Sequence, residues 1–586
     1  GPQLKPEQGC WKLEKTPAGR PPYVIWKLTG QKVKRSGPGG EGPMMDPFST
    51  EAMDAFLAPY AVFDEAGAAK PLHVYHDSWE YYGAGWSPAL FGAFKAKRGY
   101  DLRDHLKELA GIGDREDVAR IKCDYRETLS DLVIDDVFPR WVDWAHRRGV
   151  GVRNEAHGTC ANWLDFYALA DCPETEMFAA ECRDILVSKF ASSAAHVTGR
   201  RLVSSESLTW VGSHFGSTLA DCKRLVDRLF LSGVNHVFYH GLCYSPVEAP
   251  WPGWCFYASA EMNPRNPVWR DVRVLNDYVT RCQSLFQACE PDEDTLVYWP
   301  FSDYPVGADG TVGEMSVDNA PKWFHGHPIG ETARRLAAEG RAFDYVSDRM
   351  LRRGGLERYA DLVVPSCTNM PAETRAAIAG FVRRPVRTEP FPAHGLSFVR
   401  LRRKDARVYF IVNTNDHAVA CRVRPSARGE SWLMDPMTGR IERADETAEG
   451  TEIALGAFAS EFLLVDESGR PFLREAGAPS AAQGVVAVDG PWDLTPVCGG
   501  PVLPKPRRMD RLSTWSRTAD GREDPFSGTM RYRTSFDLAG PVAGECVLDL
   551  GRVGQFHARV ELEEVVVHVL VLLKVGEVGH DALECA

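Results

Sequence analysis

Between residues 70 and 290 the sequence repeats one pattern, in which a short apolar run ends in a polar or charged residue and a stretch with helical periodicity follows. Units in which a strand precedes a helix predict a parallel sheet. The helices expected between the strands cover residues 102–111, 117–147, 180–197, 218–232 and 268–288. The expected strands are Leu72–Tyr75, Gly149–Val152, Tyr167–Ala170, Leu202-Val203, His236–Tyr239 and Trp254–Tyr257.

Two observations favour a (β/α) barrel over a doubly wound parallel sheet. A doubly wound sheet carries a Gly-rich first turn, and this sequence shows none. Strands that end in carboxylates and aromatic residues are typical of a (β/α) barrel, whose site lies at the carboxyl ends of the strands. A closed barrel needs eight units, and six are visible here. We therefore expect an α/β protein with an incomplete (β/α)8 TIM-like barrel that lacks two N-terminal units.

The chain length predicts several domains. At ~150 residues per domain, 586 residues suggest three or four. We expect a partial catalytic barrel at 1–290, a small α/β domain at 291–388, a β-sandwich at 389–475 and a second, incomplete β-sandwich at 485–586. An Ala-, Gly- and Pro-rich stretch, Ala476–Gly484, predicts a linker before the last of these.

Charge and composition exclude some functions. A net charge of -12 argues against nucleic-acid or anionic-membrane partners, because phosphate binding needs clustered Lys and Arg. The apolar run Val565–Leu573 is too short to span a bilayer. The 15 cysteines form no CxxC pair and predict scattered buried thiols in a reducing compartment. The 16 tryptophans suit stacking on sugars, although core packing explains any one of them equally well.

Glutamates at the expected strand ends suit glycoside hydrolysis, which uses two carboxyl groups beside the scissile bond. The acid needs a raised pKa, which burial near apolar rings provides. Glu80 follows Trp79, Glu206 precedes Trp210 by four residues, and Glu176 follows a third expected strand. These three glutamates are the catalytic candidates. The alternative for each is a solvated or salt-bridged glutamate at the start of a loop.

A second set of residues is predicted to contact substrate. His157 could equally be a core histidine, and Pro173 makes a structural turn an alternative for Glu174 and Glu176. Clustered carboxylates would also suit Ca²⁺, but the sequence has no EF-hand loop, so the metal ligands remain unknown. The substrate-binding candidates are Glu155, His157, Glu174, Trp210, His240 and Trp254.

Several blocks in order resemble glycoside hydrolase family 106, the α-L-rhamnosidases. The resemblance covers most of residues 30–555 and is most specific in the GPGGEG loop of Lys32–Ser49 together with the ordered glutamates. The remaining blocks are Asp77-Ser78-Trp79-Glu80, Asn154–Gly158, Pro173–Phe178, Ser204–Trp210, Phe526–Thr529 and Leu548–Val553.

This resemblance implies an inverting hydrolase that removes terminal α-L-rhamnosyl groups from a carbohydrate substrate with the help of bound calcium. By motif, Glu80 would be a candidate general acid and Glu206 a candidate base, with Glu176 or Glu174 a further acidic group near the sugar or the metal. The division of roles among the glutamates stays open. An inverting site predicts carboxyl groups ~6.5–9.5 Å apart, against ~5–5.5 Å in a retaining site.

The resemblance also bears on the outer domains. The 291–388 region is similar to the amidotransferase-like domain of related hydrolases, and the 485–586 region to a galactose-binding-like sandwich. The sequence departs from the family pattern after Val553, and it lacks the upstream stretch that holds the first two barrel strands.

Two alternative functions remain. One is another barrel glycosidase, such as a β-galactosidase-like hydrolase, because the fold alone does not fix the sugar. The other is a truncated, non-catalytic carbohydrate-binding protein. The sequence leaves the oligomeric state open, and also the compartment, which would be periplasmic, extracellular or cytoplasmic in a bacterium.

Overall fold

The computed structural model describes three main stretches of the chain. These are residues 30–468 apart from 34–35, 37–38, 66, 68, 82, 179–183, 213 and 308–314, residues 486–511 apart from 489, and residues 526–536. The backbone of four short strands, at 4–7, 10–13, 546–547 and 569–570, is also described. The expected linker Ala476–Gly484 and the block Leu548–Val553 lie outside these ranges. Within them, no helix is both long and apolar enough to cross a bilayer.

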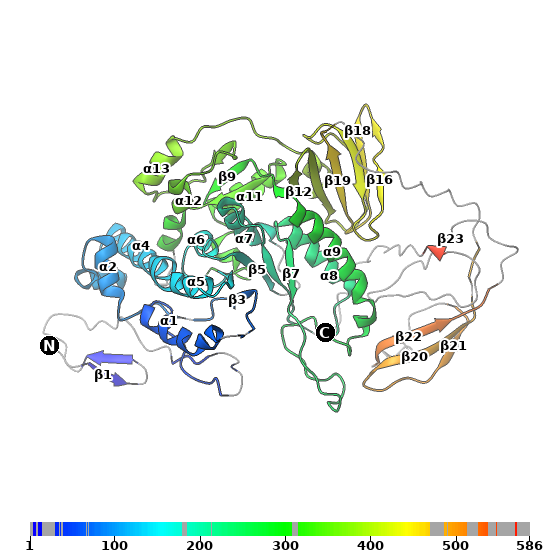
Figure 1. Cartoon of the computed structure of the whole chain (residues 1–586), viewed down its shortest axis with the longest axis horizontal. Coiled ribbons are helices and arrows are strands. Elements are labelled where there is room, and N and C mark those ends of the chain that lie inside the picture. Colours follow the sequence, from blue (N-terminus) through cyan, green and yellow to red (C-terminus); the bar gives the residue numbers. More distant parts are fainter. Residues whose placement is uncertain are drawn as a thin grey trace.

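A parallel sheet of five strands, in the order of the sequence, forms the centre of the molecule (Figure 1). Helix α5 (Phe138–His146) packs on the second strand, α7 (Ile185–Thr198) on the third and α8 (Leu219–Leu231) on the fourth. The sheet is therefore half of a barrel with helices on its outer face. Its strands are β3 (His73–His76), β4 (Gly151–Glu155), β5 (Cys172–Phe178), β6 (Ser204–Thr209) and β7 (His236–Tyr239).

Two of the six expected strands are wrong, and a third, Leu202-Val203, ends just before β6 begins at Ser204. Tyr167–Ala170 is the end of helix α6 (Trp163–Tyr167) and a turn, because Trp163 and Tyr167 together form a buried helical face. The strand begins five residues later, at Cys172. Trp254–Tyr257 forms no strand and belongs to the loop after β7, where Trp254 and Tyr257 are exposed.

The expected helices at 117–147, 218–232 and 268–288 match the structure closely. The 102–111 stretch forms two short turns, Leu102–His105 and Leu106–Leu109, and helix α7 begins only at Ile185, with residues 180–183 outside the described ranges. The 117–147 stretch is continuous, as α4 (Arg115–Asp131), a π-helical turn (Leu132–Val137) and α5. Helix α8 begins with a capping box in which Thr218 and Asp221 satisfy each other's backbone N–H groups. The long helix α9 (Val272–Ala288) closes this part of the chain.

A second parallel sheet, in the order β10-β9-β11, follows α9. Its strands are β9 (Thr295–Tyr298), β10 (Phe343–Val346) and β11 (Asp361–Val363), with helices α11 (Pro328–Ala338) and α13 (Ala372–Ala379). Helix α7 contacts both β5 and β10. One hydrophobic core consequently runs through the half-barrel and this second sheet.

The next region contains two antiparallel sheets packed face to face. A separate core that includes Tyr409, Ile411, Ile453 and Leu463 lies between them, which makes this region a β-sandwich. The six-stranded sheet holds β8 (Glu290–Pro291), β12 (Leu396–Arg403), β13 (Ala406–Asn413), β15 (Glu430–Met434), β16 (Ile441–Arg443) and β19 (Ser460–Asp466). The other holds β14 (Val419–Val423), β17 (Glu446–Thr447) and β18 (Gly450–Leu455).

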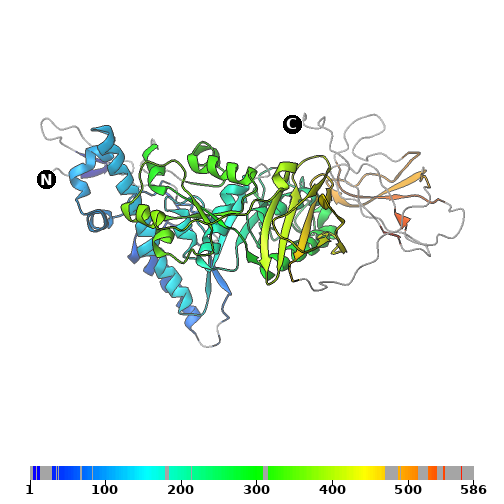
Figure 2. The ribbon, with the colours of Figure 1, turned by 90° about the horizontal axis from the view of Figure 1, so that it is seen from above.

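A small antiparallel sheet lies at the far end of the molecule. It is made of β20 (Trp492–Gly500), β21 (Arg507–Met509) and β22 (Ser527–Arg533). Figures 1 and 2 show this orange sheet at the end of the long axis opposite the blue helices α1 (Thr50–Leu57) and α2 (Leu90–Arg98). The half-barrel lies between the two ends.

Candidate active site

The register of the parallel sheet brings four glutamates to one edge. Glu155 of β4 pairs with Glu174 of β5, and Glu176 of β5 pairs with Glu206 of β6. Paired residues in a sheet project to the same face, as do residues two apart in one strand. Val152, which points the other way, is part of the core beneath the helices. The four carboxyl groups therefore lie on the face of the half-barrel that the helices leave open, at the carboxyl ends of the strands.

Glu206 has the most varied surroundings of the four. Its Oε1 accepts a hydrogen bond from the hydroxyl of Thr209 at 2.8 Å, and the hydroxyl of Tyr75 lies 3.5 Å from Oε2. Leu208 takes a left-handed backbone conformation (φ 68°), which turns the strand end at this point. Burial, followed by the negative charge of Glu176, raises the pKa of Glu206. A raised pKa suits a carboxyl group that exchanges a proton with the reacting groups.

His240 lies beside Glu206, at the end of β7. Its Nδ1 is 3.8 Å from Glu206 Oε1 and 2.8 Å from the carbonyl oxygen of Ala258. A carbonyl only accepts, so Nδ1 carries a proton and donates it to Ala258. The nearby histidine opposes the rise in the pKa of Glu206. The structure thus brings two predicted residues, Glu206 and His240, into one cluster.

Glu155 is completely buried, and neither of its carboxylate oxygens has a hydrogen-bond partner among the described residues. Burial and the charges of Glu206, Glu176 and Glu174 raise its pKa well above the usual range. One oxygen each from Asp77, Glu155 and Glu206 lie within 4.8 Å of one another. A hard cation such as Ca²⁺ binds carboxylate oxygens and would relieve this repulsion, so the residues fit the expected metal.

Glu176 is held by a histidine from the neighbouring strand end. His157 Nε2 lies 2.9 Å from Glu176 Oε2, and the backbone N–H of Val317 donates to His157 Nδ1 at 3.0 Å. Because Nδ1 accepts a hydrogen bond, the ring proton sits on Nε2 and is donated to Glu176. His157, predicted to contact substrate, is therefore in a position to orient Glu176.

Glu174 is already paired within the protein. Arg153 Nε lies 3.1 Å from Glu174 Oε2, and the Ser204 hydroxyl donates to the same oxygen. The Arg153 guanidinium is also stacked between Tyr75 and Phe238, 4.1 Å and 3.8 Å from the ring centres. Burial outweighs this cation and raises the pKa of Glu174 to about 7. Glu174 thus contributes to the floor of the site.

Glu80 stands next to the cluster on the loop after β3. The backbone N–H of Trp79 donates to the carbonyl of His157 at 2.8 Å, which joins this loop to the loop after β4. Trp79 is buried, and Glu80 is half-buried. Glu80 is outside the group of three carboxylates within 4.8 Å, whereas Asp77 of the same loop belongs to it.

The two predicted tryptophans differ in their surroundings. Trp210 follows β6 directly and is buried, and its indole N–H has no partner among the described residues. Trp254 is 59% exposed on the loop after β7, 6.2 Å from the ring of Tyr244. Trp210 therefore belongs to the wall beside Glu206, and Trp254 to an outer rim.

Four residues at this edge were absent from the predicted site: Tyr75, Asp77, Arg153 and Thr209. Asp77 ends the same apolar run as Glu80, so the rule that selected Glu80 could also have found it. Arg153 and Tyr75 lie inside strands, and only the register of the sheet shows which face they share with the glutamates.

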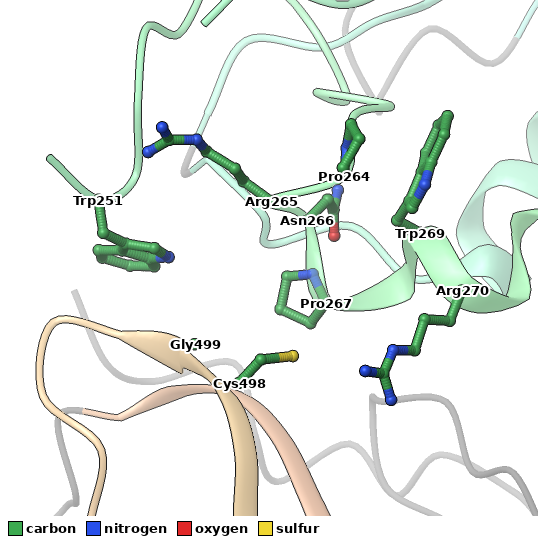
Figure 3. Close-up of a pocket in the computed structure, with 9 residues that line it drawn as sticks. All are labelled: Trp251, Pro264, Arg265, Asn266, Pro267, Trp269, Arg270, Cys498 and Gly499. Atoms are coloured by element: carbon green, nitrogen blue, oxygen red, sulfur yellow. The ribbon is translucent and has the colours of Figure 1, made fainter. Parts of the chain in front are cut away.

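A separate hollow lies between the half-barrel and the small end sheet (Figure 3). Its volume is about 180 Å³, and Figure 3 shows Trp251 and Trp269 on opposite sides of Pro267, with Cys498 below. A side chain at Gly500 would meet the Trp251 ring at 2.6 Å, so a glycine is needed at this contact. Trp251 thus connects the loop after β7 to β20, away from the carboxylates.

Carboxylates gathered at the carboxyl ends of parallel barrel strands are the arrangement that barrel glycosidases use. This is the class of protein with which the chain is compared. The family model described as alpha-L-rhamnosidase, glycoside hydrolase family 106, matches residues 23–326, a little more than half of the 586 residues. The chain belongs to this family. The matched segment contains all of the strands β3 to β7 and every predicted site residue.

Two relatives extend the comparison. A rhamnosidase from Novosphingobium sp. PP1Y has a similar structure, with a TM-score of 0.70 at 21% identity over 88% of this chain and 56% of that one. A protein of Formosa agariphila named as a putative beta-glucuronidase is 28% identical over 302 residues, 49% of this chain and 25% of the relative. The chain thus spans about half of the solved rhamnosidase and a quarter of the Formosa protein.

Proposed function

We propose that this protein is a glycoside hydrolase that removes terminal α-L-rhamnosyl groups from glycosides or glycans. The observation that carries the proposal is the half-buried Glu206, with a raised pKa, inside a carboxylate cluster at the carboxyl edge of the half-barrel, in the segment that matches the family. The strand ends of the half-barrel hold this cluster together. Neither carboxylate oxygen of Glu155 has a hydrogen-bond partner among the described residues, so both are available to a ligand.

The proposed mechanism is inverting. Glu206, as general base, takes a proton from the water that attacks the anomeric carbon, while Glu80, as general acid, protonates the departing glycosidic oxygen. Asp77 and Glu155 lie within 4.8 Å of Glu206, closer than the ~6.5–9.5 Å that separates an inverting pair. The partner of Glu206 is therefore assigned to a carboxyl group outside this trio, and Glu80 stands on the adjoining loop.

The positions of other residues suggest supporting roles. His157 would orient Glu176, and His240 would favour the ionised form of Glu206. Trp210 and Trp254 would contact the sugar and its neighbours, since flat rings pack on apolar sugar faces.

A calcium ion is proposed to be held by Asp77 and Glu155, beside the Glu206 carboxylate, which lies within 4.8 Å of both and stays free to act as the base. Bound there, it would neutralise clustered negative charge and attract substrate hydroxyl groups. The protein's own contribution would be a partly open set of oxygen ligands whose buried member, Glu155, has no competing hydrogen bond among the described residues.

Hydrolysis of p-nitrophenyl α-L-rhamnoside beside other nitrophenyl glycosides tests this proposal. We expect release from the rhamnoside alone, with loss in EDTA and recovery on adding Ca²⁺, and proton NMR should show the inverted anomer first. Release confined to a β-galactoside would favour the other barrel glycosidase. Sugar binding with no turnover of any glycoside by the folded protein would favour a non-catalytic carbohydrate-binding protein.

A further inference from the structure

Two loops beside the proposed catalytic cluster bring together a histidine, a cysteine and a glutamate. His214 lies on the loop after β6, and Cys255 and Glu261 lie on the loop after β7. One ligand atom from each of these residues lies within 4.8 Å of the others. We infer that His214, Cys255 and Glu261 form a zinc site that joins the two loops.

Glu261 supplies the buried anionic ligand of this site. It is fully buried, and its Oε1 and Oε2 accept hydrogen bonds from the backbone N–H of Phe256 at 2.6 Å and the side chain of Asn263 at 3.3 Å. Both donors are neutral. In the described part of the chain, no Lys or Arg lies within ion-pairing distance of Glu261, and only His214, at 3.9 Å, does. A bound cation would compensate this buried charge.

The backbone of Glu261 is also held in an unusual conformation. Its φ is 52°, in the left-handed region that a residue with a side chain rarely adopts. The Ser259 hydroxyl accepts from the Glu261 N–H at 2.9 Å and donates to the carbonyl of Gly241. The carboxyl group is thus aimed at Cys255 and His214 by a fixed turn.

A second thiol stands near the first. Burial and Glu261 raise the pKa of Cys243, and burial, Glu261 and Cys243 raise that of Cys255. The charge of the Glu261 carboxylate therefore acts on both thiols. Cys243 lies outside the group of ligand atoms within 4.8 Å of one another, so the fourth position of a four-coordinate zinc would be open to water.

The ligand types favour zinc over calcium here. A thiolate and an imidazole are soft or intermediate ligands that Zn²⁺ accepts, whereas the trio of Asp77, Glu155 and Glu206 offers oxygen alone. Arg265 lies nearby but is bound to loop carbonyls, at 2.8 Å from both Pro246 and Ala249.

A third group has side chains close enough to hold a metal ion, but its carboxylates are paired with cationic side chains. This group consists of His196, Glu293 and Asp344. Lys189 lies 3.5 Å from Glu293 and Arg358 lies 3.3 Å from Asp344. Among the residues that the structure describes, the His214 group has no Lys or Arg paired with its carboxylate. This difference separates a metal site from an internal salt-bridge network.

Zinc at this position would fix the walls beside the catalytic cluster. The first loop starts at Trp210, directly after β6, and the second starts at His240, which lies 3.8 Å from Glu206. The inference stands apart from the proposed rhamnosidase function, because a structural zinc would be present whatever sugar the protein cleaves.

Metal content tests the inference on the full chain. The protein is stripped with a chelator, loaded with excess Zn²⁺, dialysed and measured by mass spectrometry. We expect about one zinc per chain in the wild type and in the half-buried control Cys421→Ser of the sandwich. Cys255→Ser and His214→Ala should lose it, and His214 is exposed enough for its variant to fold.

Loading with Co²⁺ gives a second readout that calcium sites cannot produce. A thiolate-to-cobalt charge-transfer band should appear in the wild type and vanish in Cys255→Ser, while Glu155→Gln should keep it. A wild type that retains no zinc and shows no such band would overturn the inference, as would equal zinc content in the wild type, Cys255→Ser and His214→Ala.

Discussion

At the scale of single residues, the proposed site is a place where like charges are held together. Glu155 lies buried among three other glutamates, and its oxygens have no hydrogen-bond partner among the described residues. Such an arrangement costs folding free energy and is typical of functional sites.

Glu155→Gln should stabilise the protein in calcium-free buffer at neutral pH. A carboxyl group whose pKa is raised by folding lowers stability as the pH rises from its unfolded value, about 4.3, through the folded value. The substitution removes that effect, and we expect a gain on the order of 1–3 kcal/mol at pH 7. Thermal unfolding at pH 7 and pH 4 measures it, with exposed Glu449→Gln as control.

The gain from Glu155→Gln should disappear near pH 4, where the wild-type carboxyl is protonated in both states. Lower stability of the variant at pH 7 would contradict the burial of an uncompensated charge at this position.

Glu176→Gln should move the acid limb of the pH profile to lower pH. Glu176 contributes a negative charge that raises the pKa of Glu206, and the proposed base acts only when ionised. Removing that charge lowers the pKa, so activity should persist at a more acidic pH, although the maximal rate falls. The pH dependence of kcat/KM on a nitrophenyl rhamnoside measures this shift, and an unmoved limb would show that Glu206 is not the titrating base.

The sequence predicts which residue types lie at the site, but it does not predict which side chains they contact. Glu206, Glu176 and Glu155 follow the rule that polar residues at strand ends meet at one edge. The pairings of Glu174 with Arg153 and of Glu176 with His157 depend on register, which one residue's shift would reverse. Single-sequence patterns do not determine register.

At the scale of elements, the loops after β3 and β4 fit tightly together. Gly158 has a φ of 86°, and a side chain there would lie 3.0 Å from the carbonyl oxygen of Trp79. This contact fixes the segment that carries Asp77 and Glu80 relative to His157.

Gly158→Ala should therefore reduce both stability and activity. The left-handed backbone and the close contact together predict a loss of about 1–2 kcal/mol. Because Trp79 must move, kcat should fall more than thermal stability alone explains. Gly199→Ala is a matched control, since Gly199 has a φ of 75° but nothing within 4 Å of an added side chain. Equal kcat in the two variants would contradict a role for this contact in placing Glu80.

Helices were easier to foresee than strands in this chain. The 117–147 and 268–288 stretches have the apolar period of an amphipathic helix, and both are helical. Strand β5 was misplaced because three polar residues, Glu174, Thr175 and Glu176, interrupt its apolar run. A strand whose open face carries carboxylates loses the hydrophobic pattern by which strands are identified.

At the scale of the whole molecule, a buried arginine joins the second parallel sheet to the β-sandwich. Arg400 of β12 is 1% exposed and lies 2.9 Å from both Asp294 and Glu389 and 3.1 Å from Asp292. Asp294 directly precedes β9. The network therefore links the sandwich to the body that carries the site.

Arg400→Met should destabilise the molecule strongly. Removing one partner leaves buried carboxylates without their cation, which typically costs about 3–5 kcal/mol. Arg402→Met on the same strand removes an exposed pair with Glu290 and should change stability by less than about 0.5 kcal/mol. Chemical denaturation followed by tryptophan fluorescence compares the two variants, and similar losses would contradict a joining role for Arg400.

Chain length and the Ala-, Gly- and Pro-rich stretch predict several domains, but they do not predict how the domains pack on one another. The sequence predicts a separate α/β unit at 291–388, while the structure shows one continuous hydrophobic core between this region and the half-barrel. That continuity depends on α7, which is buried on almost all sides. A helix with small and apolar residues on most sides is predicted to be buried, but its sequence does not show which elements it packs against.

The most direct test of the central claim compares two glutamates with raised pKa values in different parts of the molecule. Glu206 lies at the proposed site, and Glu461, whose pKa burial raises to about 7, lies in the sandwich. With L-rhamnose release as the measurement, Glu206→Gln should lower kcat at least about 10²-fold while Glu461→Gln keeps wild-type activity. Full activity in a folded Glu206→Gln protein would contradict a catalytic site at this edge of the half-barrel.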